Sequence, residues 1–134
     1  MAPELEFAVD TVIAITGAQL IAKVNGEEIP TNATYRVKAG SILTLGFMTL
    51  GARAYIAFDG GIDVPEVLGS RSFYSLGSLG GLHGKKLEAG DDLPLGPISN
   101  TVTECVLPEH LRAPLSKNQE IRVIKGLYDH RDRK

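Results

Sequence analysis

A long segment rich in glycine and serine, GSRSFYSLGSLGGLHGKK (residues 69–86), carries most of the side chains in this sequence that could bind a ligand. Glycine lets backbone N–H groups come close to a ligand, and such groups suit anions. The serines supply hydroxyls, and the planar guanidinium of Arg71 suits a carboxylate or a phosphate. A loop of this length is uncommon in a small domain unless it has a function. Composition alone leaves a binding loop and a structural loop as open alternatives.

Each polar residue of this segment has a structural role open to it as well. Arg71 could pair with Asp59 or Asp63. Tyr74 could cover the core, and Ser70 could cap a turn. The residue types therefore predict a place where a ligand could bind without assigning the ligand.

The familiar phosphate-binding and nucleophile motifs do not fit. A Walker motif requires G-x-x-x-x-G-K-[ST] before a helix. Gly84-Lys85 supplies the GK, but Leu79 stands where the first glycine belongs and Lys86 where serine or threonine belongs. Neither G-x-G-x-x-G nor G-x-S-x-G occurs. Asp91 and Asp92 are adjacent, so in a strand they would point to opposite faces and make a poor acid–base pair.

The remaining composition excludes several classes of protein. The single cysteine, Cys105, cannot form an internal disulfide, and we expect it to be a small buried residue. It lies far from the three histidines (His83, His110 and His130), so we expect no metal site. A net charge of −2 argues against nucleic acid. The absence of a long apolar run and of a signal peptide predicts a cytoplasmic protein away from membranes.

Short β-branched runs separated by turn residues predict strands. They lie at residues 4–7, 11–16, 35–46 with a turn at Ala39-Gly40, 53–58 and 120–124. Asn25-Gly26 between two extended pieces predicts a hairpin with a type I′ turn. Helix signals are confined to single turns at Asp63–Gly69 and Pro108–Leu115. This pattern predicts an all-β barrel or sandwich.

One internal echo relates two parts of the chain. VKAGSILTLG (residues 37–46) and LEAGDDLPLG (residues 87–96) share the pattern apolar-charged-Ala-Gly-x-x-Leu-x-Leu-Gly. We interpret them as two similar corners of one barrel. The length of 134 residues fits one domain, which we place at residues 1–126, followed by a flexible, solvated tail at residues 127–134 that ends in HRDRK.

Two ordered motifs carry a resemblance to a known family. They are RAYIAFDGGIDVPEVLGSRS (residues 53–72) and GGLHGKKLEAGD (residues 80–91), preceded by DTVIAITGAQL and VNGEEIP. They resemble the family of the 5-oxoprolinase C subunit, also called the KipA or allophanate hydrolase subunit 2 family, which is related to the carboxyltransferase domain of urea carboxylase. The resemblance covers residues 7–96, with a weaker echo at residues 120–126. It implies a cyclophilin-like β-barrel.

The resemblance also implies partners and cofactors. Family members act with a KipI-like B subunit, and together with an A subunit they convert 5-oxoproline to glutamate at the expense of ATP. The urea carboxylase relatives take a carboxyl group from carboxybiotin. The resemblance implies no cofactor on this chain itself, so ATP or carboxybiotin would belong to the complex. The alternative is a regulatory module that antagonises a KipI-like kinase inhibitor. A third and weaker possibility is a cyclophilin-type prolyl isomerase.

The substrate-binding residues follow from the GSRS-x-Y motif and the paired glycines after it, while the catalytic residues stay unassigned. Family members carry a further segment of about sixty residues before this region and a second barrel after it. We therefore expect this chain alone to be catalytically inert. The predicted contacts to an anion or an amide are Ser70, Arg71, Ser72, Tyr74, Gly80 and Gly81.

Overall fold

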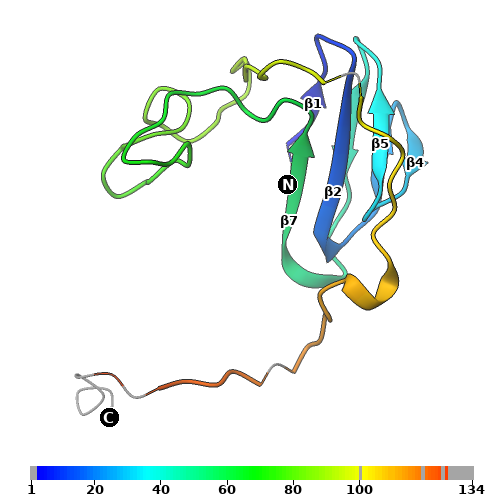
Figure 1. The fold of residues 1–134 in the computed structure, drawn as a ribbon, viewed down its shortest axis with the longest axis vertical. Helices are drawn as coiled ribbons and strands as arrows, with labels where there is room; N and C mark the ends of the chain where they lie inside the picture. Colours follow the sequence, from blue (N-terminus) through cyan, green and yellow to red (C-terminus); the bar gives the residue numbers. More distant parts are fainter. Residues whose placement is uncertain (1–2, 100, 119, 125, 127–134) are drawn as a thin grey trace.

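The computed structural model describes residues 3–99, 101–118, 120–124 and 126, and these form an all-β fold of two antiparallel sheets (Figure 1). The first sheet has the order β1 (Leu5–Glu6), β6 (Ile42–Leu45), β3 (Ala22–Val24) and β4 (Glu27–Ile29). The second has the order β5 (Thr34–Val37), β2 (Thr11–Gln19) and β7 (Leu50–Phe58). The predicted all-β class is confirmed.

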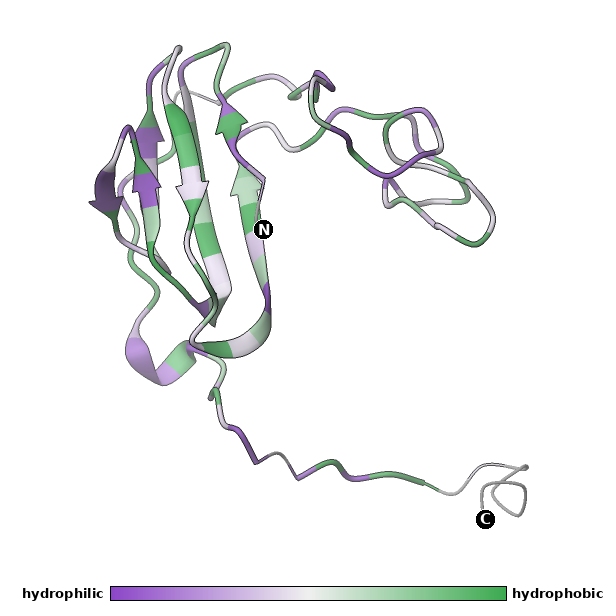
Figure 2. Ribbon diagram, turned by 180° about the vertical axis from the view of Figure 1, so that it is seen from behind, coloured by the Kyte–Doolittle hydropathy of each residue, from purple (hydrophilic) through white to green (hydrophobic). Residues whose placement is uncertain are grey.

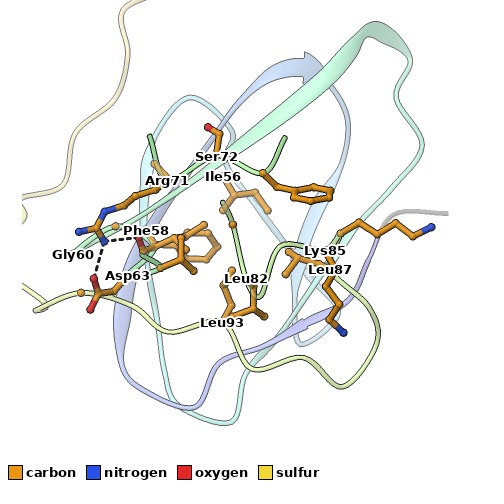
Figure 3. Close-up of a pocket in the computed structure, with 18 of the residues that line it drawn as sticks. Ile56, Phe58, Gly60, Asp63, Arg71, Ser72, Leu82, Lys85, Leu87 and Leu93 are labelled. Atoms are coloured by element: carbon orange, nitrogen blue, oxygen red, sulfur yellow. Dashed lines mark hydrogen bonds and ion pairs between the residues drawn. The ribbon is translucent and has the colours of Figure 1, made fainter. Parts of the chain in front are cut away.

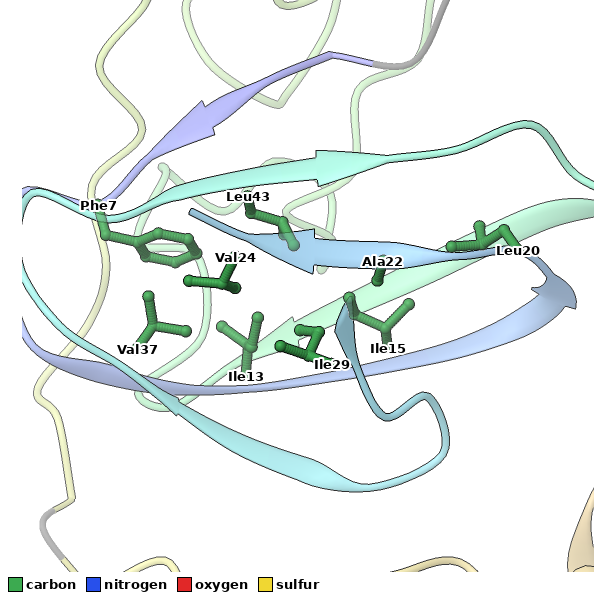
Figure 4. Packing of buried hydrophobic residues seen from close by; sticks show 9 residues of the cluster. All are labelled: Phe7, Ile13, Ile15, Leu20, Ala22, Val24, Ile29, Val37 and Leu43. Atoms are coloured by element: carbon green, nitrogen blue, oxygen red, sulfur yellow. The ribbon is translucent and has the colours of Figure 1, made fainter. Parts of the chain in front are cut away.

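The core lies between the two sheets (Figure 4). Alternation along β2 turns Ile13 and Ile15 inward, and both are almost completely buried. Figure 2 shows apolar residues along the middle of the sheets, whereas the edge strand β4 is hydrophilic. In such a strand one face is buried and the other exposed, and β-branched side chains pack well on this pleated surface. The buried cluster comprises Phe7, Ile13, Ile15, Leu20, Ala22, Val24, Ile29, Val37 and Leu43.

The predicted hairpin is confirmed. Asn25 and Gly26 have φ angles of 52° and 86°, as a type I′ turn requires, and they join β3 to β4. The side-chain oxygen of Asn25 also accepts the backbone N–H of Ile42 at 2.9 Å. The turn residue therefore fastens the hairpin to β6 as well as reversing the chain.

The turn at residues 38–41 carries the chain from one sheet to the other. Ser41 N–H donates to the Lys38 carbonyl at 3.1 Å, and Gly40 has φ of 79°. Positive φ at the third residue is the mark of a type II turn, which favours glycine there. Asp10 accepts the Ala39 N–H at 2.9 Å and thereby holds the corner.

The second copy of the echo makes the same turn without the strands. Asp91 N–H donates to the Glu88 carbonyl at 3.2 Å, and Gly90 has φ of 90°. After this turn, the second copy (residues 87–96) pairs with other described residues only through an isolated bridge between Leu95 and Ile62. The repeated sequence therefore encodes a repeated turn, and only its first copy is a corner between two sheets.

The two sheets do not close into a barrel within the described residues. Two local expectations about the backbone, a helical turn at residues 63–69 and a strand at residues 120–124, are wrong. Residues 63–69 form no helix, because Leu68 and Gly69 have φ of 52° and 76° and make a tight turn in which Val67 and Ser70 exchange backbone hydrogen bonds. Positive φ angles are incompatible with a right-handed helix. The second predicted helical turn is present as a short 3₁₀ helix, η1 (Glu109–Leu111).

The predicted strand at residues 120–124 is also absent. Its side chains alternate as a strand requires, but no described strand lies beside it. Ile121 and Val123 are 77% and 80% exposed. A strand needs a hydrogen-bonded neighbour, so alternation without a partner leaves extended chain. The tail at residues 127–134 lies outside the described residues. In the described part of the chain no helix is long and apolar enough to cross a membrane.

A candidate ligand pocket between β7 and the glycine-rich arm

Residues 59–97, here called the arm, leave the sheets and return to them, as both ribbon views show (Figures 1 and 2). The base of the arm, here called the neck (residues 60–63 and 94–97), is tied by its backbone. Gly96 N–H donates to the Gly61 carbonyl at 2.9 Å, and Asp63 N–H donates to the Pro94 carbonyl at 2.8 Å. The two ends of the arm are therefore fixed to each other.

The neck closes because two glycines pack against each other. Gly60 has φ of 82°, and a Cβ at this position would lie 2.8 Å from the Pro97 carbonyl oxygen and closer still to that of Gly96. A Cβ on Gly96 would in turn overlap the Gly60 carbonyl. Only glycine allows two backbones to come this close.

A pocket of about 950 Å³ lies between the end of β7 and the arm (Figure 3). Figure 3 shows Phe58, Leu82 and Leu93 gathered near its centre, although they come from three separate parts of the chain. The volume and the mainly apolar lining are typical of small-molecule sites. The apolar walls comprise Ile56, Phe58, Val64, Phe73, Leu82, Leu87 and Leu93.

Arg71 lies on one side of the pocket, where it contacts the neck (Figure 3). Its Nη1 donates to Asp63 Oδ1 at 2.7 Å and to the Ile62 carbonyl at 3.1 Å. Both contacts use the same nitrogen, and Nε and Nη2 make none with the described residues. The sequence offered Asp59 or Asp63 as the partner of Arg71, and the structure shows the pair with Asp63. Two donor nitrogens of Arg71 therefore remain available to a ligand.

Lys85 lies on the opposite side of the pocket, where it fastens the turn at residues 88–91 (Figure 3). Its Nζ is 2.9 Å from Glu88 Oε2 and 3.2 Å from Asp91 Oδ1. Hydrogen bonds to Glu88 and then Asp91 raise the pKa of Lys85 above its ordinary 10.5. The Glu88 backbone N–H and then Lys85 hold the pKa of Asp91 below its ordinary 3.8. The turn is therefore held by a charged network.

This network predicts that the turn loosens in acid. Because the fold lowers the pKa of Asp91, the stability that its carboxylate contributes is complete above the ordinary value of 3.8 and is lost as the pH falls through the folded-state pKa. An NMR titration should show the Glu88 amide signal moving with Asp91 below that value. In an Asp91→Asn variant the acid response should disappear. A Glu88 amide that ignores acid in the unaltered protein would contradict the network.

The structure separates the predicted site residues into two groups. Arg71, Ser72 and Gly81 line the pocket, whereas Ser70, Tyr74 and Gly80 are not part of its lining. The roles of the first three in binding stay predictions.

The second group has structural contacts instead. Ser70 Oγ accepts the Ser72 N–H at 3.1 Å, which is the turn-capping alternative. Tyr74 is 55% exposed and exchanges backbone hydrogen bonds with Leu79 at 2.8 and 3.3 Å. Gly80 has φ of 71°, and a Cβ there would overlap the Ser72 carbonyl. These residues shape the arm.

Sequence reasoning missed the apolar walls and the lysines. The sequence assigns Phe58 only to a strand, and it presents Lys85 and Lys86 only as a poor match to a Walker motif. The usable signal was the apolar spacing in the second motif, where Leu82 and Leu87 flank the two lysines.

The expected burial of Cys105 is wrong, since this residue is exposed. Its backbone N–H donates to Thr34 Oγ1 at 2.8 Å, so the backbone here follows the edge of β5 and the thiol is left outside. Among the described residues no group of three or more His, Cys, Asp or Glu side chains lies close enough together to hold a metal ion.

Comparisons with known proteins agree on one family. Residues 1–133 match the family described as "Carboxyltransferase domain, subdomain A and B". The urea amidolyase of Saccharomyces cerevisiae is 42% identical over 125 residues, which cover 90% of this chain and 7% of that protein. The C subunit of Escherichia coli 5-oxoprolinase is 42% identical over 92 residues, which cover 69% of this chain and 30% of that protein.

A solved structure is similar along most of the chain. The urea carboxylase of Kluyveromyces lactis superposes with a TM-score of 0.77 at 38% identity, covering 87% of this chain and 11% of that one. This chain therefore spans less than a third of the length of each of these three relatives.

Proposed function

Since the chain belongs to the carboxyltransferase-domain family, subdomains A and B, we propose that it forms the amide-binding part of a biotin-dependent carboxyltransferase. The substrate class is a small amide, a group that urea and 5-oxoproline share. The observation that carries this proposal is the apolar pocket with spare guanidinium donors at its side. The wider coverage of this chain by the yeast urea amidolyase, 90% against 69% for the bacterial 5-oxoprolinase protein, favours carboxyl transfer over ring opening.

Each pocket residue has a definite task in this proposal. Arg71 donates from Nε and Nη2 to the amide carbonyl, while its Nη1 stays on Asp63. A guanidinium held at one nitrogen is oriented before the ligand arrives, which lowers the entropy lost on binding. Ser72 adds a hydroxyl and Gly81 an approachable backbone. The apolar walls remove water from the amide and strengthen these contacts.

The pocket also fits the ring system of biotin. Its walls are apolar, and Gly61, which lines it, has open space where a side chain would lie, with nothing within 4 Å of a Cβ. Phe58, Leu82 and Leu93 would hold the rings. When bound, biotin supplies the carboxyl group that is transferred. The residues of this chain then position the acceptor amide and exclude water from it.

Partner proteins complete this proposal. A KipI-like B subunit, with an A subunit in the 5-oxoprolinase arrangement, would supply the remaining machinery and the use of ATP. In such an assembly the two sheets would form part of the cyclophilin-like barrel. The second candidate is the 5-oxoprolinase reaction itself, which the 42% identity to the bacterial C subunit supports. A purely regulatory module would bind a KipI-like partner without turnover in the complete complex.

Replacing Arg71 by alanine tests the proposal. We expect amide consumption by the complete complex, with biotin and ATP present, to fall on the order of tenfold to a hundredfold, the usual effect of removing a charged donor from a site. The measurement is the steady-state rate with urea or 5-oxoproline as the amide. Arg53→Ala, at an exposed position on β7 outside the pocket, is the matched control and should keep full activity.

An Asp63→Asn variant separates contact from positioning. If Arg71 touches the amide, Asp63→Asn should cost much less than Arg71→Ala, because the guanidinium remains. Equal losses would show that Arg71 acts only through the neck. Unchanged turnover in Arg71→Ala would refute the proposed site. If the complex assembles but consumes neither amide, the regulatory module becomes the favoured function.

A further inference from the structure

The charges that line the pocket do not cancel. The charged side chains there are Asp63, Arg71, Lys85 and Lys86. Asp63 and Arg71 neutralise each other at 2.7 Å. Lys85 is compensated by Glu88 and Asp91, which approach it from outside the pocket lining at 2.9 and 3.2 Å. The balance of the pocket therefore depends on Lys86.

Lys86 has no such compensation. Its side chain makes no hydrogen bond or ion pair with any residue that the structure describes. It follows Lys85 directly, but the turn network holds only the first lysine. Lys86 thus contributes one positive charge that the described part of the protein leaves unpaired at the pocket.

An unpaired cation beside an apolar wall selects for charge. Lys86 itself is exposed, and the lining near it includes Leu82, which is buried, and Leu87, which is 56% exposed. An unpaired cation attracts an anion, whereas a cation already paired with carboxylates, such as Lys85, attracts an anion weakly. A ligand with a carboxylate therefore binds more tightly in this pocket, whereas an uncharged amide of the same shape gains no affinity from Lys86.

We propose that the pocket selects a ligand with one carboxylate and that Lys86 is the residue that receives it, while Arg71 receives the amide. This inference rests on the proposed amide-binding function and adds the charge of the ligand to it. The carboxylate has two possible sources, which share one chemistry. It belongs either to the amide itself, as in 5-oxoproline, or to the group that donates the carboxyl.

Two ring compounds test the selection on the complete complex. 5-Oxoproline and pyrrolidone have the same lactam ring, but only the first has a carboxylate. Lys86→Gln should weaken binding of 5-oxoproline about tenfold and leave pyrrolidone unchanged, since only a charge-assisted contact is removed. Lys86→Arg should restore most of the affinity. Lys23→Gln, at an exposed position on β3 outside the pocket, is the control and should change neither.

The other outcomes are distinguishable. If 5-oxoproline binding is unchanged in Lys86→Gln but KM for the carboxyl donor rises about tenfold, the carboxylate is the donor's and the selection stands. Equal weakening of both lactams would overturn the inference and make Lys86 a structural residue. If Lys86→Gln changes binding of no ligand while Arg71→Ala still lowers turnover, the inference is overturned and the amide site stands. A complex that neither binds the lactams nor consumes an amide would remove both proposals.

Discussion

Replacing Gly60 by alanine is expected to open the neck and destroy the pocket. The φ of 82° costs an alanine about 1 kcal/mol, and its Cβ would press on the carbonyls of Gly96 and Pro97. These are backbone atoms of the opposite side of the neck, so no side chain can move aside. We expect the N–H groups of Asp63 and Gly96, which bond across the neck, to exchange with solvent about tenfold faster or more. Hydrogen exchange followed by NMR measures this directly.

Gly61→Ala is the matched control for Gly60→Ala. Gly61 is the next residue and also has positive φ, 69°, but a Cβ there meets nothing within 4 Å. It therefore has the backbone strain without the steric overlap. We expect the N–H groups of Asp63 and Gly96 to keep their slow exchange in Gly61→Ala, because the neck stays closed, while Gly60→Ala opens it. Equal opening of the neck in both variants would show that strain, and not the contact between the two glycines, controls the pocket.

The second large effect is expected in the core. Leu43 is completely buried on β6, where Leu5 and Val24 are its neighbours on the flanking strands. Leu43→Ala removes buried methyl groups and leaves a cavity that the two sheets cannot fill, so the free energy of unfolding should fall by about 3 kcal/mol. Domains of this size are stable by roughly 5–15 kcal/mol, so this is a large share of the total. Urea unfolding followed by circular dichroism measures the change.

The neighbouring residue provides the control for this substitution. Ile42 lies on the same strand, points the other way and is 42% exposed. Ile42→Ala should cost about 1 kcal/mol or less, because much of its side chain is already in water. Neither residue lines the pocket, so both variants should retain amide binding below their unfolding transitions. A larger loss for Ile42→Ala than for Leu43→Ala would contradict the observed register of β6.

Local sequence patterns predicted the sheets well. The strand at residues 11–16 followed from β-branched alternation, and the structure extends it to Gln19 past Gly17, where a register shift admits a glycine with φ of 96°. The Asn25-Gly26 turn followed from its own φ requirements. The all-β class needed nothing beyond such short-range rules. Where a pattern required a distant partner, as at residues 120–124, the same rules predicted a strand that is not there.

The pocket could be predicted only in part, because its walls meet through long-range contacts. Arg71 and Gly81 were predicted from a single loop and do line it. Phe58 and Leu93 are 35 residues apart and come together only because the neck closes between them. No local sequence pattern predicts that Gly60 and Gly96 will lie in contact. The charge balance of the pocket could not be predicted either. Lys85 and Lys86 are adjacent in the sequence, and only the fold shows that Glu88 and Asp91 pair with Lys85.

The closed neck has a consequence for how this molecule tolerates changes in length. Once the ends of the arm are tied to each other, the span between them is a loop whose closure entropy grows only with the logarithm of its length, about 0.6 kcal/mol for each doubling. Extra residues near Leu76, an exposed position outside the pocket lining, would therefore add little to the cost of closure. A single residue inserted between Gly60 and Asp63 would shift the register across the neck. Variation in length among such chains should accumulate at the outer end of the arm and be purged at its base.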